Sequence, residues 1–226
     1  MSQNSRGDIK TLAYVLRRTN YGEADRILNL ITPVGKMSAI VKGVRREKSK
    51  LAGGVEMFSL VELVVHQGRG EIGVVTSAKM VKYHSNLVTD LARMELAGMI
   101  LKKTSLAAEG KETPDFFEIV RESLTELDAG AGTRVVEAWF LINLLRVSGE
   151  EINLYRDASG ARLAAGMLYD WDLVERAFVA RGEGEFDEND IKLMRLMTTS
   201  KLALARRVKD IDGRIDKILK IIRNVV

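Results

Sequence analysis

The chain has 226 residues, 46% hydrophobic and 29% charged, with a formal net charge of +4, which is typical of a globular protein with a buried core. Its longest apolar run, Ala138 to Leu145, is too short for a membrane span of about 20 residues. The absence of cysteine excludes disulfides and thiolate metal sites. The first residues also lack the apolar core of a signal peptide, so we expect a cytoplasmic protein.

The first 80 residues carry strand signals, in which apolar side chains alternate with polar ones and turn residues follow at short intervals. Turn chemistry stands at Asn20-Tyr21-Gly22 and at Pro33-Val34-Gly35. The predicted strands cover residues 8–18, 26–32, 37–42, 58–66 and 70–77. Five short strands with close turns are typical of a small closed or part-open barrel.

Beyond Lys79 the apolar period changes from about 2 to about 3.6, which predicts helices. We expect them from about Asn86, from Thr113-Pro114, and over 134–147, 187–197, 201–208 and 211–222, the last with a basic outer face. Residues 150–185 are mixed in character and are compatible with a short hairpin around 157–160. The predicted class is α+β, with a five-stranded barrel in residues 1–82 followed by an α-helical bundle in 83–226.

The stretch Gly35–Gly54 concentrates positive charge. Six basic residues against Glu47 give it a local charge of +5, more than the net charge of the whole chain. A strand that runs into a cationic, glycine-ended loop suits contact with phosphates, which predicts strong salt dependence and little base preference. A solvated surface loop is the alternative that the residues leave open. The six are Lys36, Lys42, Arg45, Arg46, Lys48 and Lys50.

No pattern indicates catalysis, a cofactor or a metal. Gly68–Gly73 has the spacing of a dinucleotide fingerprint, but a strand follows it instead of a helix, which predicts a hairpin turn. His66 and His84 lack a neighbouring cysteine or spaced carboxylate, so we expect structural or exposed side chains. The acidic stretch 183–190 is interpreted as a solvated helix N-terminus, and Trp139 as a packing residue. We therefore predict a protein that is not an enzyme.

Four motifs, in the right order, resemble the bacterial RecO family. Gly22–Leu28 contains an E-x-D-R strand, and Gly35-Lys36 is a G-K turn. Lys42–Leu51 fits K-G-x-R-R-x-x-S-[RK]-L, and Phe58–Leu63 fits F-x-x-x-E-L. Beyond Tyr83 the similarity rests on a helical bundle of the right length and not on sequence motifs.

The resemblance implies an N-terminal OB-fold, a nucleic-acid-binding barrel, followed by a helical partner-binding domain. It implies a recombination mediator in DNA repair after DNA damage, which binds single- and double-stranded DNA and anneals complementary strands. It also implies help in loading the recombinase RecA onto strands coated by single-stranded-DNA-binding protein. Implied partners are that coating protein, through its acidic C-terminal tail, and RecR, in the nucleoid-associated cytoplasm. The DNA-contacting candidates carried over are Arg26, Lys36, Lys42, Arg45, Arg46, Lys48 and Lys50.

Many members of that family carry a four-cysteine zinc element after the third long helix, whereas residues 150–185 contain no cysteine, so no zinc is expected. For the acidic tail, a carboxylate favours cations beside an apolar pocket. The candidates are Lys102, Lys103 and Arg121. Two other functions stay open: an RNA-binding OB module associated with the ribosome or tRNA, and an adaptor whose basic loop docks acidic tails.

Overall fold

The computed structural model describes residues 7–68, 70 and 72–225, so residues 1–6, Arg69, Glu71 and Val226 lie outside the described part of the chain. The chain folds into two compact units, residues 1–128 and residues 129–226. The predicted α+β class, with an N-terminal five-stranded barrel followed by helices, is confirmed.

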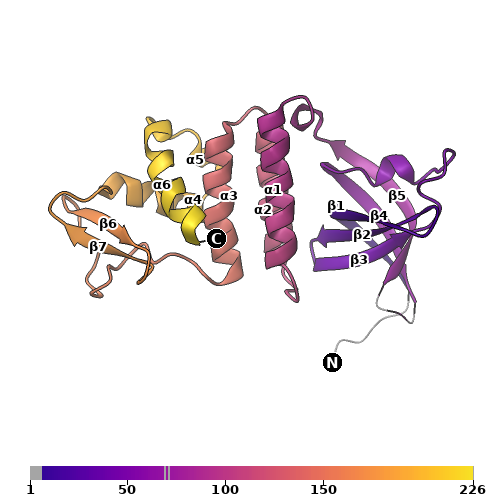
Figure 1. The fold of residues 1–226 in the computed structure, drawn as a ribbon, viewed down its shortest axis with the longest axis horizontal. Coiled ribbons are helices and arrows are strands. Elements are labelled where there is room, and N and C mark those ends of the chain that lie inside the picture. The colour runs from indigo at the N-terminus through magenta and orange to yellow at the C-terminus, as the bar shows by residue number, and fades with distance from the viewer. Residues whose placement is uncertain (1–6, 69, 71, 226) are drawn as a thin grey trace. The chain divides into compact units, whose positions relative to one another are not determined.

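Unit 1 is built on a barrel that closes in the strand order β1-β2-β3-β5-β4 (Figure 1). The first strand is long because its N-terminal half pairs with β4 and its C-terminal half with β2. All neighbouring strands run antiparallel except β3 and β5, which pair in parallel over two positions. The strands are β1 (Gly7–Tyr21), β2 (Asp25–Thr32), β3 (Gly35–Val41), β4 (Ser59–Gln67) and β5 (Gly73–Tyr83).

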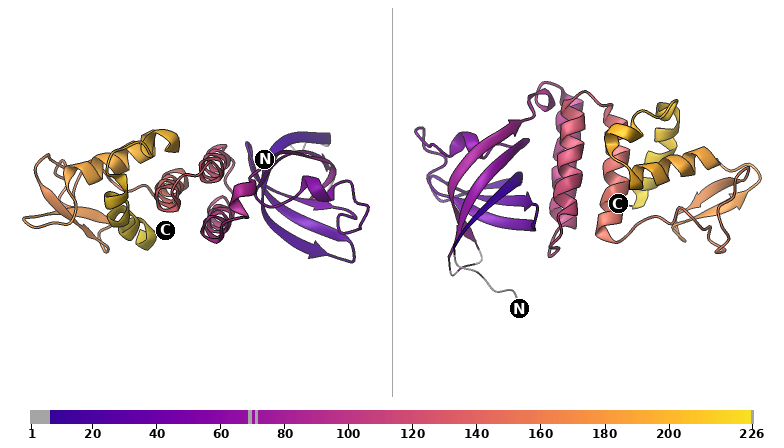
Figure 2. Two further views of the ribbon diagram at one scale, coloured as in Figure 1. Left: turned by 90° about the horizontal axis from the view of Figure 1, so that it is seen from above. Right: turned by 180° about the vertical axis from the view of Figure 1, so that it is seen from behind.

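The core of the barrel follows from the period-2 alternation of each strand. Leu28 and Leu30 of β2, and Val61, Leu63 and Val65 of β4, are fully buried, while the residues between them are partly exposed. The view from above in Figure 2 shows the strands wrapping around one interior. Each buried Leu or Val contributes about 1.5–3 kcal/mol, so the alternation fixes the register of the strands.

Several predicted boundaries are wrong in unit 1: the first strand ends at Tyr21 instead of Arg18, and the fifth begins at Gly73 instead of Gly70. The fifth strand ends at Tyr83 instead of Ser77, because its second half keeps pairing with β4 although nearly all of its side chains are exposed. The first helix begins at Leu91 instead of Asn86, after a short 3₁₀ turn, η2 (Ser85–Leu87). Asp90 caps it by accepting a hydrogen bond from Arg93 N at 3.0 Å.

The helices α1 (Leu91–Ala107) and α2 (Asp115–Asp128) pack against each other and against β1 within unit 1. The buried ring of Tyr14 lies 5.8 Å from that of Phe117. Asp128, the last residue of α2, accepts a hydrogen bond from Asn86 N at 3.0 Å. These contacts place both helices in one compact unit with the barrel. The expected division into a domain of residues 1–82 and a domain of residues 83–226 stays a prediction.

Unit 2 contains helices and a β-hairpin. The apolar face of α6 buries Ile215, Ile218 and Ile222, and α6 packs with α4 against α3. The strands β6 and β7 pair antiparallel. The elements are α3 (Thr133–Ser148), β6 (Leu168–Asp172), β7 (Ala177–Arg181), α4 (Glu188–Thr199), α5 (Leu202–Ala205) and α6 (Ile211–Val225).

The hairpin with regular strands in this unit is β6–β7. Around residues 157–160 the chain makes a short antiparallel turn, with a bridge between Arg156 and Arg162 and a hydrogen bond from Leu163 N to Tyr155 O at 3.0 Å. The buried Phe178 holds the hairpin, since its ring contacts Tyr169, Trp171 and Phe186 at centroid distances of 5.2–6.3 Å. Of the helix predicted over 201–208, the structure forms only the short α5 (Leu202–Ala205). In the described part of the chain, no helix is long and apolar enough to cross a membrane.

Candidate nucleic-acid interface

The loop from Lys42 to Phe58, which joins β3 to β4, is tied to the barrel. Val44 is 3% exposed and Val55 fully buried, so two apolar anchors enter the core. The backbone N–H of Arg45 donates to Ala24 O at 2.9 Å, and that of Gly43 to the Asp25 carboxylate at 2.7 Å. The first half of the loop therefore has a defined path beside the start of β2.

Glycine at position 43 has a conformational reason. Its φ is +63°, in the left-handed region that other residues adopt only with strain. The chain turns there from the end of β3 toward the start of β2, where Val44 enters the core and the backbone N–H of Arg45 reaches Ala24 O.

Five of the predicted contacts share this loop and point into solvent. Each is exposed, and none forms an ion pair with a residue that the structure describes. Arg45 alone has a described side-chain hydrogen bond, from its guanidinium to the carbonyl of Gly22 at 3.3 Å. The loop contains two acidic residues, Glu47 and Glu56, and Glu56 pairs with Arg18 of β1 at 2.8 Å, so the positive potential of the five cations is nearly uncompensated. The five are Lys42, Arg45, Arg46, Lys48 and Lys50.

Arg26 lies beside the same loop. It pairs with Val41 across the β2–β3 ladder, so it is next to the point where the loop begins. Its Nε donates to Asn20 Oδ1 at 3.2 Å, and the side chain is half-buried. The structure thus brings Arg26, Lys42 and Arg45 to one rim of the barrel.

Lys36 lies elsewhere. It stands at the other end of β3, about 20 Å from Lys42 along the strand. Its ammonium group donates to Ser105 O at 2.9 Å and forms an ion pair with Glu109, and its side chain is only 15% exposed. The structure therefore separates Lys36 from the loop and gives it a role in holding α1.

Tyr21 belongs to this rim although sequence reasoning passed over it. The side chain is 56% exposed at the end of β1. The next residue, Gly22, supplies the carbonyl that accepts from Arg45. The sequence around it indicates only a turn, and the one signal for Tyr21 is an aromatic residue placed just before Gly22.

The basic face of α6 is neutralised. Arg214 Nη1 lies 2.7 Å from Asp187 Oδ1 and 2.6 Å from Asp190 Oδ1. Lys217 and Lys220 pair with Asp190 and Glu185 at 3.3 and 2.9 Å. The stretch 183–190 is thus not merely a solvated helix N-terminus: it contains the capping box of α4 and holds α6 through these ion pairs.

The candidates for the acidic tail do not share one environment. Lys102 is exposed on α1, three residues after Met99 and four before Leu106, whose side chain is 72% exposed. Lys103 is half-buried. Arg121 of α2 pairs with Glu118 and lies over the ring of Phe117 at 5.9 Å. Of the three, Lys102 best fits an exposed cation with apolar neighbours.

The other residues weighed for function are structural. His84 is fully buried, and its Nε2 lies 3.2 Å from the hydroxyl of Tyr14. His66 lies at the barrel surface, 2.8 Å from an Asp8 carboxylate oxygen. Trp139 is buried and donates its indole N–H to Ser200 O at 3.0 Å. Gly68–Gly73 connects antiparallel β4 and β5, as the predicted hairpin turn requires, with Arg69 and Glu71 outside the described residues.

A closed five-stranded barrel of this strand order, with a cationic loop after β3, defines the chain as an OB-fold protein with a helical region following the barrel. Family models agree with this layout. The one described as Recombination protein O N terminal matches residues 6–84, and the one described as Recombination protein O C terminal matches residues 89–225. The chain belongs to the recombination protein O (RecO) family.

Curated relatives carry the name DNA repair protein RecO. The one from Dehalococcoides mccartyi (strain ATCC BAA-2266 / KCTC 15142 / 195) is 33% identical over 144 residues, which are 63% of this chain and 56% of that protein. The one from Alkaliphilus metalliredigens (strain QYMF) is 39% identical over 119 residues, 51% of this chain and 48% of that protein. The chain thus spans about half the length of the curated relatives it matches.

Proposed function

We propose that this protein is a DNA-binding recombination mediator in DNA repair. In this role it binds single- and double-stranded DNA, anneals complementary strands, and helps to load a recombinase onto strands coated by single-stranded-DNA-binding protein. The observation that carries the proposal is the tethered β3–β4 loop with its five exposed cations, none of which forms an ion pair with a described residue. Membership of the RecO family and the names of its relatives support the DNA repair role.

The rim chemistry suits a strand of nucleic acid. Flexible lysine and arginine side chains follow phosphates whatever the base sequence, and the released counterions make binding salt-dependent. The exposed ring of Tyr21 offers a face on which one base can stack, an interaction of about 1–3 kcal/mol. Arg26, Lys42 and Arg45 flank that position, so the proposed path of the strand runs from Tyr21 along the loop.

The test replaces Arg45, Arg46, Lys48 and Lys50 with Ala. Affinity for single strands should fall for all base sequences alike, and the salt slope should drop by about 0.7 for each phosphate that the loop no longer neutralises. Annealing of complementary strands, bare or coated, should fall in parallel. Fluorescence anisotropy over a salt series and a dye-pair annealing assay measure both.

A matched control removes the same charge from exposed positions of unit 2, with Arg181, Lys201, Arg207 and Lys209 changed to Ala. It should keep most of the affinity, because net charge alone does not position a strand. Wild-type affinity and salt slope in the loop variant would refute the interface. Tighter binding to RNA than to DNA of equal length would favour the RNA-binding module instead.

For partners we propose the acidic C-terminal tail of the coating protein, with RecR as a second partner and the recombinase engaged only indirectly. Lys102, flanked by Met99 and the exposed Leu106, is the proposed tail contact, since a carboxylate gains from a cation beside apolar surface. Lys102→Glu in the full chain should weaken binding of the tail peptide, with Lys192→Glu on α4 as the control. Equal weakening by both would show a non-specific charge effect.

A further inference from the structure

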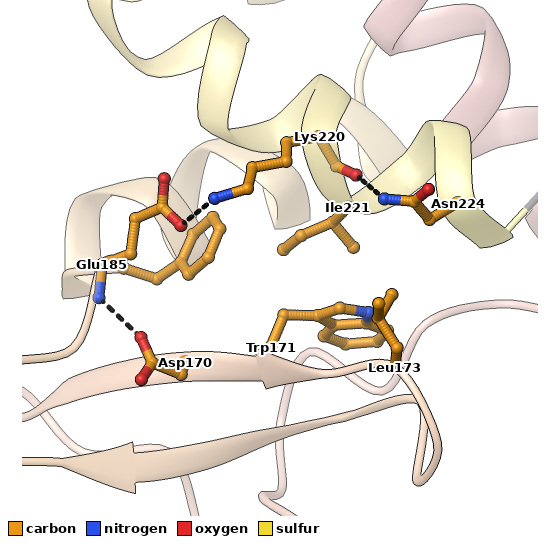
Figure 3. Close-up of a pocket in the computed structure, with 8 residues that line it drawn as sticks. Asp170, Trp171, Leu173, Glu185, Lys220, Ile221 and Asn224 are labelled. Atoms are coloured by element: carbon orange, nitrogen blue, oxygen red, sulfur yellow. Dashed lines mark hydrogen bonds and ion pairs between the residues drawn. The ribbon is translucent and has the colours of Figure 1, made fainter.

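Two hollows of unit 2 share the side chain of Trp171 as a wall. The larger, of about 270 Å³, lies between the hairpin and α6, with Trp171 and Leu173 facing Ile221 across the gap (Figure 3). The smaller, of about 180 Å³, is lined by Ile152 and Arg176. We call the two hollows together the Trp171 groove.

The size and the walls of the groove suit one large side chain of a bound chain. Each hollow is smaller than the roughly 300–1,000 Å³ of small-molecule sites. Beside the larger one, Leu173 and Val174 at the hairpin tip are 59% and 89% exposed, an apolar projection of the kind found at protein contacts. The groove therefore has the form of a docking site for a peptide segment.

The indole N–H of Trp171 lacks a partner. Its nitrogen is buried and makes no hydrogen bond to any described group. A buried donor left without an acceptor costs about 1–3 kcal/mol. Because that nitrogen is inaccessible to solvent, a segment in the groove meets the ring of Trp171 and not its N–H.

The charge of the groove selects the kind of segment. Its lining holds four carboxylates and two cations, a net charge of −2 in a chain whose net charge is +4. Both cations already pair within the lining: Lys220 with Glu185 at 2.9 Å and Arg176 with Glu150 at 3.7 Å. This leaves Asp170 and Glu151 without a cation in the lining, with Asp170 accepting only the backbone N–H of Glu185 at 3.0 Å. The lining therefore repels phosphates and acidic peptides and attracts basic ones.

We propose that the Trp171 groove binds a basic peptide segment of a partner protein. One apolar side chain of that segment enters between Trp171 and Ile221. Flanking Lys or Arg residues face Asp170 and Glu151. This site belongs to unit 2, whereas the cationic rim belongs to unit 1, and it does not depend on the proposed function.

The location of binding is tested with the full chain labelled with 5-fluorotryptophan. Fluorine NMR follows Trp171, while the buried Trp139 serves as an internal reference. The probes are the capped peptide GKRFKRG, its Ala analogue GKRAKRG, the charge-reversed GEDFDEG and a short oligothymidylate. We expect a saturable shift of the Trp171 signal with GKRFKRG, at least about fivefold weaker binding of the Ala analogue, and no shift with the other two.

Variants then test each contact by anisotropy of labelled GKRFKRG. Leu173→Ala shortens the apolar wall of the larger hollow and should weaken binding about fivefold. Glu151→Lys should weaken it about three- to tenfold, whereas Glu95→Lys, the same change on exposed α1, should not. The proposal is overturned if GKRFKRG does not bind, if it binds without moving the Trp171 signal, or if GEDFDEG or the oligonucleotide binds there more tightly.

Discussion

His84 shows how one residue makes unit 1 sensitive to pH. Burial, and next the charge of Lys82, lower the pKa of His84, while the carboxylate of Asp128 opposes them. In the unfolded chain a histidine titrates near 6.5, so below that pH the unfolded state binds more protons than the folded state. The stability from neutral His84 is therefore complete above about pH 6.5 and is lost progressively as the pH falls toward the lowered folded pKa.

We predict that His84→Gln makes the stability of unit 1 less dependent on pH between 7.5 and 5.5. The dependence removed is at most about 1.4 kcal/mol for each pH unit. Hydrogen exchange of the β1 amides at both pH values measures it. Thr76→Ser, which changes an exposed side chain of β5 and no titratable group, is the control and should keep the wild-type pH dependence. A His84→Gln protein with the full wild-type dependence would contradict the prediction.

Asp190 is the second residue whose burial defines its role. It is fully buried, pairs with Arg214 and Lys217, and accepts from the backbone N–H of Asp187 at 3.0 Å. Those cations are partly solvated, so removing the charge costs less than the 3–5 kcal/mol of a fully buried pair.

We predict that Asp190→Asn destabilises unit 2 by about 1–3 kcal/mol, measured by urea unfolding with Trp139 fluorescence. Asp212→Asn, on the exposed first turn of α6, should stay within about 0.5 kcal/mol of the wild type. Adding Arg214→Met to Asp190→Asn should cost less than the sum of the two single changes, because the pair is already broken. Strict additivity would show that the pair contributes nothing.

At the scale of elements, the two ends of β3 perform different tasks. At its start, Gly35 has a φ of +115° and backs closely onto the connection between α1 and α2: a Cβ there would lie 2.8 Å from Lys111 O. The adjacent Lys36 is held by the C-terminal turns of α1. At the other end of β3, the chain enters the cationic loop.

We therefore predict that a Lys→Met change affects stability at the start of β3 and nucleic-acid affinity just after its end. Lys36→Met should destabilise unit 1 by about 1–2 kcal/mol because its charged hydrogen bonds are removed, with single-strand affinity within about twofold of the wild type. Lys42→Met should leave stability unchanged and lower both the affinity and the salt slope. Thermal unfolding measures the stability of both variants, and fluorescence anisotropy on the same preparations measures their affinity for single strands. Weaker binding by Lys36→Met would show that Lys36 contacts the nucleic acid after all.

At the scale of the whole molecule, the segment after α3 is organised by hydrogen bonds. The carboxylate of Asp157 accepts from the backbone N–H groups of Ser159 and Ala161 at 2.9 and 3.0 Å. Arg195 donates to Leu154 O at 2.8 Å and lies over the ring of Tyr155. Among the described residues, no group of three or more His, Asp or Glu side chains could hold a metal ion.

We predict that the purified protein carries no stoichiometric zinc and that a chelator leaves its unfolding curve unchanged. Elemental analysis and urea unfolding with and without chelator test this. As a control, a protein with a structural zinc site should lose stability under the same treatment. One zinc per chain, or unfolding on chelation, would overturn the prediction.

Features that depend on local pattern could be predicted from the amino-acid sequence. Period-2 alternation located the five strands, the change to a longer period located the helices, and the spacing of six cations identified the charged stretch. These features are readable because each residue's preference is set by its near neighbours along the chain.

Which of those residues act together depends on the tertiary fold. Folding paired residues 78–83 with β4, drew Lys36 to α1, and neutralised the basic face of α6 with the acidic stretch. It also left Lys42 and Arg45 beside Tyr21, and Trp171 against α6. These outcomes depend on partners far apart in the sequence, and a charge looks the same in a sequence whether or not folding brings its counter-ion to it.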